Sequence, residues 1–365
     1  MRDEALNLLA RLTEAHGAPG HEDEVRAIFC DELKGAGRFS SDRLGCVMCE
    51  GTANQKVPRV MLTAHMDEVG FLVQTITESG FLKIVPLGGW WTQTLLAHRV
   101  RVKTHIGREV RGVIASTPPH FLSEADRNKV LTIEQLSIDI GASSRAQAED
   151  EFAVRPGDPI VPDVTMTRLA DRHLLMGKAF DNRAGLGVVI QAFRQLAGTE
   201  HLPNTVSAVG TVQEEIGCRG AMTAATLARP DVALILEGTP ADDTPGCGSD
   251  GSQGAIGKGP QIRVMDPSAL MNRRLVDFVC DVAAEKSIPF QVAVRRGGGT
   301  DARSFQVAHL GAPCVVIGVP ARYIHSHNSI IDINDYLATL TLVVEVTRRL
   351  DAATAAELVS YLPAD

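Results

Sequence analysis

The chain has 365 residues, of which 44% are hydrophobic and 22% are charged. This composition excludes disordered, collagen-like and coiled-coil proteins, and the length suggests about two domains with ample sequence for a buried core. The formal net charge of −8, with no long basic block, argues against nucleic acid or an anionic membrane as the main partner and favours small molecules or peptides.

The N-terminal segment predicts a cytoplasmic protein. Charges are spread through residues 1–17, and no uninterrupted apolar stretch is followed by a small-residue cleavage site, as a signal peptide would require. No run of about 18 apolar residues occurs, so we expect no transmembrane helix.

Two helices and a buried strand are expected first. Residues 2–16 and 21–36 carry apolar side chains at helical spacing, and residues 58–64 have the pattern of a short buried strand. This strand delivers His65 at its carboxyl end. Because ligands of open α/β sheets bind outside those ends, we expect the segment HMDE (65–68) to lie at the ligand crevice, where it can take part in chemistry.

The pattern of the sequence is different between residues 69 and 166. Short β-like runs, such as GFLVQTI (70–76) and HRVRVKT (98–104), are broken by glycine and proline. We therefore expect a small β-rich domain, barrel-like in form, inserted at 69–166. The remaining residues, 1–68 and 167–365, then form the catalytic domain, which is the carrier domain of the insertion.

Helices and strands alternate in the remainder, which predicts an α/β fold for the carrier domain. The expected elements, in chain order, are a helix at 181–198, strands at 204–213 and 231–237, a helix at 266–286, a strand at 290–294, a helix at 300–309, a strand at 313–319 and a final helix at about 333–352.

Most of the candidate functional side chains follow an apolar strand. They are His65 after residues 59–64, Glu214 and Glu215 after 206–213, Glu237 after 231–236, and His325 shortly after 314–323. Packing does not easily explain similar side chains at four strand ends. A further candidate, Asp181, instead opens a helix.

Two histidines and three carboxylates can converge on two metal ions, and one glutamate is left over as a base. Zinc, cobalt and manganese accept imidazole and carboxylate donors, and a bridging carboxylate can hold two ions about 3.5–4 Å apart. In the pair Glu214–Glu215, one side chain can bind metal while the other faces the attacking water. Asp67 could accept the free ring N–H of His65 and orient it, although a turn or capping role is the alternative.

The chain resembles the cytosolic dinuclear metallo-aminopeptidases of the tetrahedral (TET) type, a group that includes proteins labelled glutamyl aminopeptidase, FrvX-like and endoglucanase or cellulase M. The match spans nearly the whole chain. It is carried by AHMDEVGF (64–71), GGWW (88–91), GKAFDNRAG (177–185), VQEEIGCRGA (212–221), LEGTPADDTPG (236–246), GGGTDA (297–302) and RYIHS (322–326).

This resemblance implies a mixed-sheet catalytic domain like that of zinc exopeptidases, with two divalent ions per subunit. It implies that Asp181 bridges the metals and that the Asp181–Asn182 peptide bond is cis. It also implies that His65 and Glu237 complete one metal site and that Glu215 and His325 complete the other. Glu214 would be the general base, and Asp67 would orient His65.

The resemblance also implies an assembly. Residues 69–166 would form a dimerisation domain, and the dimers of the family often assemble into a dodecamer. Trp90 and Trp91 could contribute exposed apolar surface to assembly, with packing inside the inserted domain as the alternative.

Some residue assignments stay open at this level. Glu237 occupies a position where aspartate is also used in the family. His327 offers a second imidazole two residues after His325, and Asp301 could shape the substrate site or simply belong to a glycine-rich turn.

The function expected from these residues is removal of N-terminal residues from peptides. A dipeptidase, a carboxypeptidase or an N-deacylase on the same metal core is the nearest alternative. A non-catalytic metal-binding assembly scaffold is the alternative from another class. A glycosidase is disfavoured because aromatic residues, which often form its sugar platforms, make up only 4% of the chain.

Overall fold

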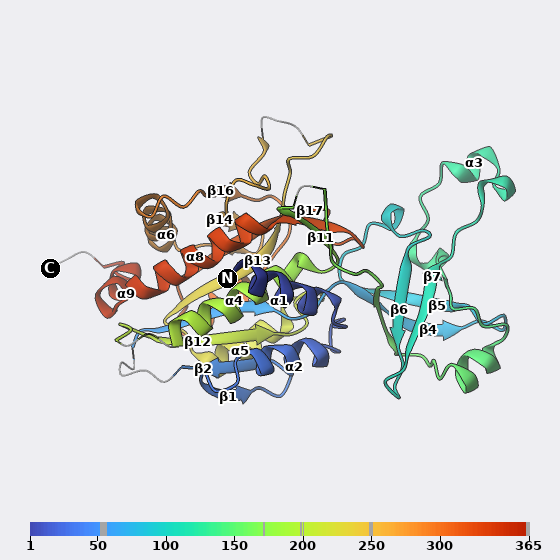
Figure 1. Cartoon of the computed structure of the whole chain (residues 1–365), viewed down its shortest axis with the longest axis horizontal. Coiled ribbons are helices and arrows are strands. Elements are labelled where there is room, and N and C mark those ends of the chain that lie inside the picture. Colours follow the sequence, from blue (N-terminus) through green and yellow to red (C-terminus); the bar gives the residue numbers. More distant parts are fainter. Residues whose placement is uncertain (52–56, 171, 198, 200, 248–250, 363–365) are drawn as a thin grey trace.

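The computed structural model describes residues 1–51, 57–170, 172–197, 199, 201–247 and 251–362. An α/β body and a closed β-barrel make up the chain, and the barrel projects from one end of the body (Figure 1). The predicted fold class, an α/β catalytic domain with a barrel-like insertion, is confirmed.

The central sheet of the body contains twelve strands within the described residues. Four parallel neighbours, in the order β12-β3-β13-β17, form its middle, and antiparallel strands flank them on both sides. The strands of this sheet are β1 (Arg38–Ser41), β2 (Val47–Glu50), β3 (Arg59–His65), β10 (Thr167–Arg168), β11 (Leu174–Gly177), β12 (Thr205–Thr211), β13 (Val232–Pro240), β14 (Gln261–Asp266), β15 (Ala269–Leu270), β16 (Gln291–Val294), β17 (Cys314–Arg322) and β18 (Ser329–Asp332).

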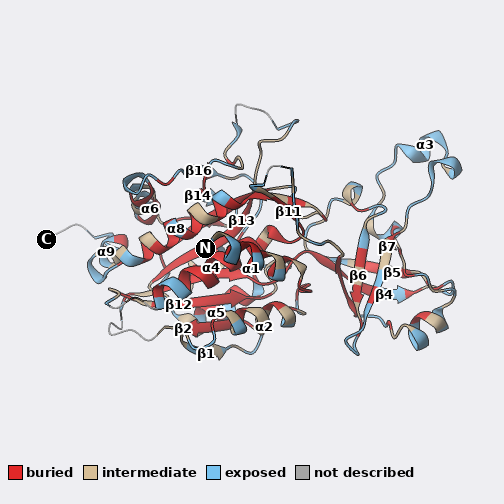
Figure 2. Ribbon diagram, in the orientation of Figure 1, coloured by how far each residue is buried: buried red, intermediate tan, exposed pale blue. Residues whose placement is uncertain are grey.

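Helices cover both faces of this sheet. Helix α4 packs on β3, β12 and β13, α8 packs on β17 and β18, and α1 packs on α4 and α8. Helix α5 packs on β12, and α7 packs on β13 and β17 (Figure 1). The middle strands are therefore buried on both sides, which explains their near-continuous apolar sequences (Figure 2). The helices are α1 (Arg2–Glu14), α2 (Asp23–Glu32), α3 (Glu124–Arg127), α4 (Phe180–Ala197), α5 (Arg219–Ala228), α6 (Arg273–Glu285), α7 (Ala302–Phe305), α8 (Ile333–Arg349) and α9 (Ala352–Leu358).

The barrel closes in the order β4-β5-β8-β7-β6-β9 and has its own hydrophobic core, which includes Phe71, Val100 and Ile160. Closure removes sheet edges, so this small unit leaves no barrel strand unpaired. Helix α3 lies on an exposed excursion between two barrel strands (Figure 2). The barrel strands are β4 (Gly70–Ile76), β5 (Leu82–Leu87), β6 (Arg99–Lys103), β7 (Glu109–Ile114), β8 (Ile138–Asp139) and β9 (Pro159–Pro162).

Several predicted helix boundaries are wrong. The helix expected at 266–286 begins at Arg273, because Asn272 caps it by accepting the Leu275 N–H at 2.9 Å, and the residues before it form the β14–β15 hairpin. The final helix ends at Arg349. Asp351 then caps the separate helix α9.

The helix expected at 300–309 spans only Ala302–Phe305. Turns follow it, and His309 has a φ of 55°, which a right-handed helix cannot continue through. Gly198, the last residue of the helix expected at 181–198, lies outside the described residues. Within the described part of the chain, no helix is both long and apolar enough to cross a membrane, and the cytoplasmic location stays a prediction.

Candidate metal centre

The predicted functional residues converge at one edge of the sheet. The parallel strands β12, β3, β13 and β17 point their carboxyl ends the same way, and His65 ends β3 directly beside Thr211, the last residue of β12. Strand β13 continues past Glu237 to Pro240, so this glutamate lies within the strand rather than after it. A pocket of about 450 Å³ is lined by His65, Asp181, Glu214, Glu215, Glu237 and His325.

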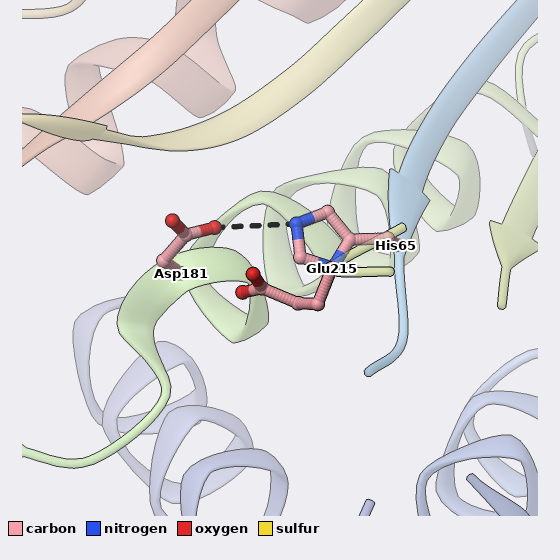
Figure 3. Close-up of side chains that lie close together, drawn as sticks. All are labelled: His65, Asp181 and Glu215. Carbon is pink, nitrogen blue, oxygen red and sulfur yellow. Dashed lines mark hydrogen bonds and ion pairs between the residues drawn. The ribbon is translucent and has the colours of Figure 1, made fainter. Parts of the chain in front are cut away.

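Asp181 lies between the two histidines. Its Oδ1 atom is 3.2 Å from His65 Nε2, and its Oδ2 atom is 3.4 Å from His325 Nε2. Figure 3 shows Asp181 at the start of α4 with its carboxylate pointing toward the ring of His65 at the end of β3. The Asp181–Asn182 peptide bond is cis, as the resemblance implies. One carboxylate thus faces two imidazoles through separate oxygens.

Each imidazole has a glutamate beside it as well. Glu237 Oε2 lies 3.7 Å from His65 Nε2, and Glu215 Oε2 lies 3.4 Å from His325 Nε2. By these distances Glu237 is the glutamate nearer His65 and Glu215 is the one nearer His325, while Glu215 also belongs with His65 and Asp181 to a set whose ligand atoms all lie within 4.8 Å of one another. The division into two metal sites that the resemblance implies stays a prediction.

Glu214 lies at the side of this arrangement. Its Oε2 atom is 3.9 Å from His65 Nε2, and its Oε1 atom accepts a hydrogen bond from the Cys218 thiol at 3.2 Å. Burial raises the pKa of Glu214 to about 7. A carboxyl group with a pKa near neutrality can both accept and release a proton, which suits an acid–base role.

Asp67 lies behind His65 and is fully buried. The Nδ1 atom of His65 is 3.2 Å from the Asp67 backbone carbonyl oxygen and 3.4 Å from Asp67 Oδ1. The two carboxylate oxygens also accept the backbone N–H groups of Glu214 and Glu215, each at 3.0 Å. Sequence reasoning anticipated the contact between the Asp67 carboxylate and the His65 ring. It did not anticipate the two contacts between that carboxylate and the backbone N–H groups.

The site holds more carboxylates than imidazoles. Burial lowers the pKa of His65, but hydrogen bonds with Asp181 and Asp67 outweigh it and raise that pKa well above its ordinary value. Burial is likewise outweighed at His325, where Glu215 and Asp181 raise the pKa to about 10. The carboxylates around the two rings are those of Asp67, Asp181, Glu214, Glu215 and Glu237. Such an excess of buried negative charge favours bound cations.

The side chains present fit divalent metal ions. Imidazole nitrogens and carboxylate oxygens are the donors that zinc, cobalt and manganese accept. The ligand atoms of His65, Asp181 and Glu215 all lie within 4.8 Å of one another. Glu215 Oε1 is buried without a hydrogen-bond partner among the described residues, as expected for an atom that faces a cation.

The structure separates His325 from His327. His325 faces Asp181 and Glu215, whereas His327 is buried and stacks on His98 with ring centroids 4.3 Å apart. Burial lowers the pKa of His327 to about 3. This ring is therefore a neutral packing group beside the barrel.

Asp301 lies close to Glu214 rather than in an open glycine-rich turn. It is buried, its Oδ2 atom accepts a hydrogen bond from Thr211 Oγ1, and it belongs with Glu214 and Cys218 to a group whose ligand atoms lie within 4.8 Å of one another. Burial raises the pKa of Asp301 to about 6.

Sequence reasoning missed the part played by the two glycines of GGWW. The Gly89 carbonyl oxygen accepts a hydrogen bond from His325 Nδ1 at 2.8 Å, which fixes the tautomer of that ring. Gly88 has a φ of 87°, and a Cβ atom there would lie 2.6 Å from Val69 and 3.1 Å from Glu215 Oε2. The motif was visible in the sequence, but only the fold brings it to the metal centre.

The chain is similar to known proteins over most of its length. The family model described as M42 glutamyl aminopeptidase matches residues 45–342. A glutamyl aminopeptidase of Lactococcus lactis is 33% identical, and the alignment covers 98% of this chain and 100% of that protein.

Solved structures are similar to the chain as well. The TET aminopeptidase from a marine sediment Thaumarchaeota archaeon has 41% identity and a TM-score of 0.93, with 98% of this chain and 99% of that one covered. The TET1 peptidase of Pyrococcus horikoshii, which can assemble into a tetrahedron or a large octahedral shell, has 30% identity and a TM-score of 0.83, with coverage of 96% and 100%. The chain belongs to the M42 glutamyl aminopeptidase family.

Proposed function

We propose that this chain removes N-terminal residues from peptides at the pocket around Asp181, with two divalent metal ions in each subunit. Family membership makes the chain a metal-dependent aminopeptidase. The number of ions and their ligands belong to the proposal. The observation that carries it is the position of Asp181, whose two oxygens face two separate imidazoles.

The proposed ligand sets are those that the resemblance implies. Asp181 would bridge the ions, His65 and Glu237 would complete one site, and Glu215 and His325 would complete the other. Zinc, cobalt and manganese all accept this mixture of nitrogen and oxygen donors.

The reaction would then divide between the ions and the protein. When bound, the ions polarise the carbonyl group of the peptide bond and lower the pKa of a coordinated water to about 7. Glu214 would accept the proton of the attacking water and transfer it to the leaving amine. Asp67 would hold His65 in one orientation and would keep the Glu214–Glu215 backbone in place, since it contacts both.

Assembly of the subunits is a separate part of the proposal. Residues 69–166 would form a dimerisation domain, and dimers would join into a dodecamer. Trp91, next to the barrel, supports this assembly because 62% of its surface is accessible. The Pyrococcus relative, which can assemble into a tetrahedron or a large octahedral shell, supports it as well. Trp90 is half-buried and stacks on Phe71, so Trp91 is the stronger candidate. Sedimentation velocity of the full chain would distinguish monomer, dimer and dodecamer.

A substrate panel tests the proposed activity. Protein stripped of metal, then supplied with cobalt, zinc or manganese, is given free and N-acetylated aminoacyl p-nitroanilides. We expect metal-dependent cleavage of the free-amine substrates only. Cleavage of the blocked substrates would instead favour an N-deacylase or a related amidohydrolase, and lack of cleavage with every metal would favour a non-catalytic scaffold.

A further inference from the structure

A second cluster of possible metal ligands lies beside the candidate metal centre. It consists of Glu214, Cys218 and Asp301, whose ligand atoms all lie within 4.8 Å of one another. Cys218 immediately precedes α5 and Asp301 immediately precedes α7, and these two helices pack on each other. Cys218 is the one cysteine among the described residues that line the pocket, so an ion that enters the pocket can reach its thiol.

The thiol and the Glu214 carboxylate lie at nearly the spacing of two ligands on one ion. Cys218 Sγ is 3.2 Å from Glu214 Oε1, and the thiol proton lies between the two atoms. In a tetrahedral zinc site, with about 2.3 Å to sulfur and about 2.0 Å to oxygen, the sulfur and the oxygen are about 3.5 Å apart. A cation that replaces the thiol proton would therefore require little movement of either side chain.

Asp301 adds a buried oxygen that has no partner. Only 1% of the surface of this residue is exposed. Thr211 Oγ1 donates a hydrogen bond to Asp301 Oδ2, whereas Asp301 Oδ1 is buried without a hydrogen-bond partner among the described residues. A buried carboxylate oxygen in this state is costly and uncommon in folded proteins. It therefore points to a ligand that the chain itself does not supply.

The negative charge of the cluster has no lysine or arginine to balance it. Among the described residues, Glu214 pairs only with His65, at 3.9 Å, and that ring is already shared with the carboxylates of the candidate metal centre. Asp301 forms no ion pair with any residue that the structure describes. Buried carboxylates are paired or coordinate metals in most proteins, so a divalent cation would supply the missing charge.

We propose that Glu214, Cys218 and Asp301 form an additional metal site that binds Zn²⁺ when zinc is in excess and thereby inhibits the enzyme. On binding, a metal–sulfur bond forms to Cys218, the thiol proton passes to solvent, and one oxygen of each carboxylate coordinates the same ion. No electron is transferred. The ion then occupies the side chain that would accept the proton of the attacking water.

The inhibition rests on the proposed function, because it requires Glu214 to be the base. The metal site itself does not depend on that role. Its sulfur ligand also predicts which ions bind, since thiolates favour zinc, whereas manganese prefers carboxylates, carbonyl groups and water. We therefore expect inhibition by excess Zn²⁺ and none by excess Mn²⁺.

Cobalt reports the metal–sulfur bond directly. Cobalt bound to a thiolate has a ligand-to-metal charge-transfer band in the near ultraviolet, and cobalt bound only to nitrogen and oxygen lacks it. The five candidate ligands of the metal centre contain no sulfur, so this band is specific to the additional site. The metal-stripped full chain, with its thiols kept reduced, is titrated with CoCl2. We expect the band to appear, and added Zn²⁺ should abolish it.

Cys218→Ser tests the residue assignment. A serine hydroxyl can still donate a hydrogen bond to Glu214 Oε1, but a neutral hydroxyl does not replace a thiolate as a ligand. We expect the band to be lost and the Zn²⁺ concentration that halves the activity to rise about tenfold or more. Cys218→Ala provides a second variant with the same expected results.

Cys247→Ser is the matched control, because Cys247 is exposed and lies outside the pocket. It should keep both the band and the inhibition. Displacement of the two ions of the candidate metal centre by zinc would affect the Cys218 and Cys247 variants alike, so the difference between them reports the additional site. Unchanged circular dichroism and melting temperature would show that the variants fold, and the wild-type titration depends on no variant.

The outcomes separate this inference from the proposed function. A charge-transfer band that is absent from the wild type, or that survives in both Cys218 variants, overturns the additional site and leaves the aminopeptidase function standing. Equal zinc inhibition of the Cys218 and Cys247 variants overturns the inhibitory role. A band that depends on Cys218, in a protein that cleaves no substrate with any metal, overturns the proposed function and leaves the metal site standing.

Discussion

Asp67 holds the backbone of Glu214, because its Oδ1 atom accepts the Glu214 N–H at 3.0 Å. Its Oδ2 atom accepts the next N–H, that of Glu215, at the same distance. The carboxylate that lies beside the His65 ring therefore also holds the segment that carries the candidate base and one candidate ligand. Movement of this single carboxylate would disturb both halves of the site.

Replacement of Asp67 by asparagine tests this double role. An amide has one acceptor oxygen, so one of the two backbone N–H groups would lose its partner and face an NH2 group instead. We expect metal affinity to fall about 10- to 100-fold and kcat to fall with it. A chelator competition titration and steady-state kinetics provide the two measurements.

Asp42 offers a matched control for this substitution. It also accepts backbone N–H groups, from Leu44, Gly45 and Cys46, but it lies outside the pocket. Asp42→Asn should reduce stability and leave metal affinity unchanged. Wild-type metal affinity and turnover in Asp67→Asn would contradict the role assigned to Asp67.

Glu214→Gln should separate proton transfer from metal binding. The glutamine keeps the size of the side chain but cannot accept a proton, so we expect kcat to fall by about 10²- to 10⁴-fold while the metal content is retained. Glu215→Gln should instead lower the metal content. Elemental analysis of both variants, combined with kinetics, distinguishes the two roles. Near-normal turnover of a metal-replete Glu214→Gln protein would exclude Glu214 as the base.

The two neighbouring histidines should behave differently when replaced by alanine. His325→Ala removes an imidazole that faces Asp181 and Glu215, so we expect a lower metal content and little activity. His327→Ala removes a ring that stacks on His98, so we expect an unchanged metal content and a loss of about 1–3 kcal/mol in the free energy of unfolding. Elemental analysis and urea denaturation test this pair, and the reverse pattern would assign the ligand role to His327.

Stability should fall in mild acid because of His16. This side chain is fully buried, and burial together with the charges of Lys178, Lys103 and Arg101 lowers its pKa from 6.5 to about 2. Below pH 6.5 the unfolded chain binds a proton that the folded chain does not, so acid favours unfolding. The contribution of His16 between about pH 7.5 and about pH 5.5 is a loss of about 1.4 kcal/mol.

Urea denaturation at the two pH values measures this loss. His16→Gln has no titrating ring, so its stability difference between the two pH values should be smaller than that of the wild type by this amount. Equal pH dependence in both proteins would show that His16 does not titrate as predicted.

Glu68 should be essential to stability, because it pairs with two buried cations beside the site. Lys178 Nζ donates to the two Glu68 oxygens at 2.5 and 2.7 Å, and Arg183 Nη2 donates to Glu68 Oε1 at 3.3 Å. Glu68→Gln leaves two buried cations without a carboxylate, which should cost about 3–5 kcal/mol in the free energy of unfolding. Glu285→Gln breaks an exposed pair with Arg349 and should leave the urea midpoint unchanged. Similar midpoints for the two variants would contradict this prediction.

The sequence determined much of the architecture, because buried strands and helices carry apolar residues in a recognisable local pattern. The middle strands are covered by helices on both faces, so their apolar runs marked β3, β12, β13 and β17 and identified the polar residues that follow or end them. Short β-like runs broken by glycine and proline likewise marked the barrel. The order of the motifs, together with the family resemblance, was enough to predict which residues meet at the candidate centre, and their division into two metal sites stays a prediction.

Helix boundaries were less predictable because single contacts decide them. The side chain of Asn272 starts α6 seven residues later than the apolar periodicity indicates, since the intervening residues pair as a hairpin. Asp351 starts a separate helix in the same way. Periodicity shows which face of a segment is buried, but it does not show where a cap competes with the helix.

Only the tertiary structure decided how distant segments meet at the site. It placed Asp67 against two backbone N–H groups that lie 147 and 148 residues away in the chain, and it placed the Gly89 carbonyl of the inserted segment on His325. It also directed His327 into a packed stack and brought Asp301 beside Glu214. Strand order and loop path fix these contacts, and a local sequence pattern records neither, because each contact depends on residues far away in the chain.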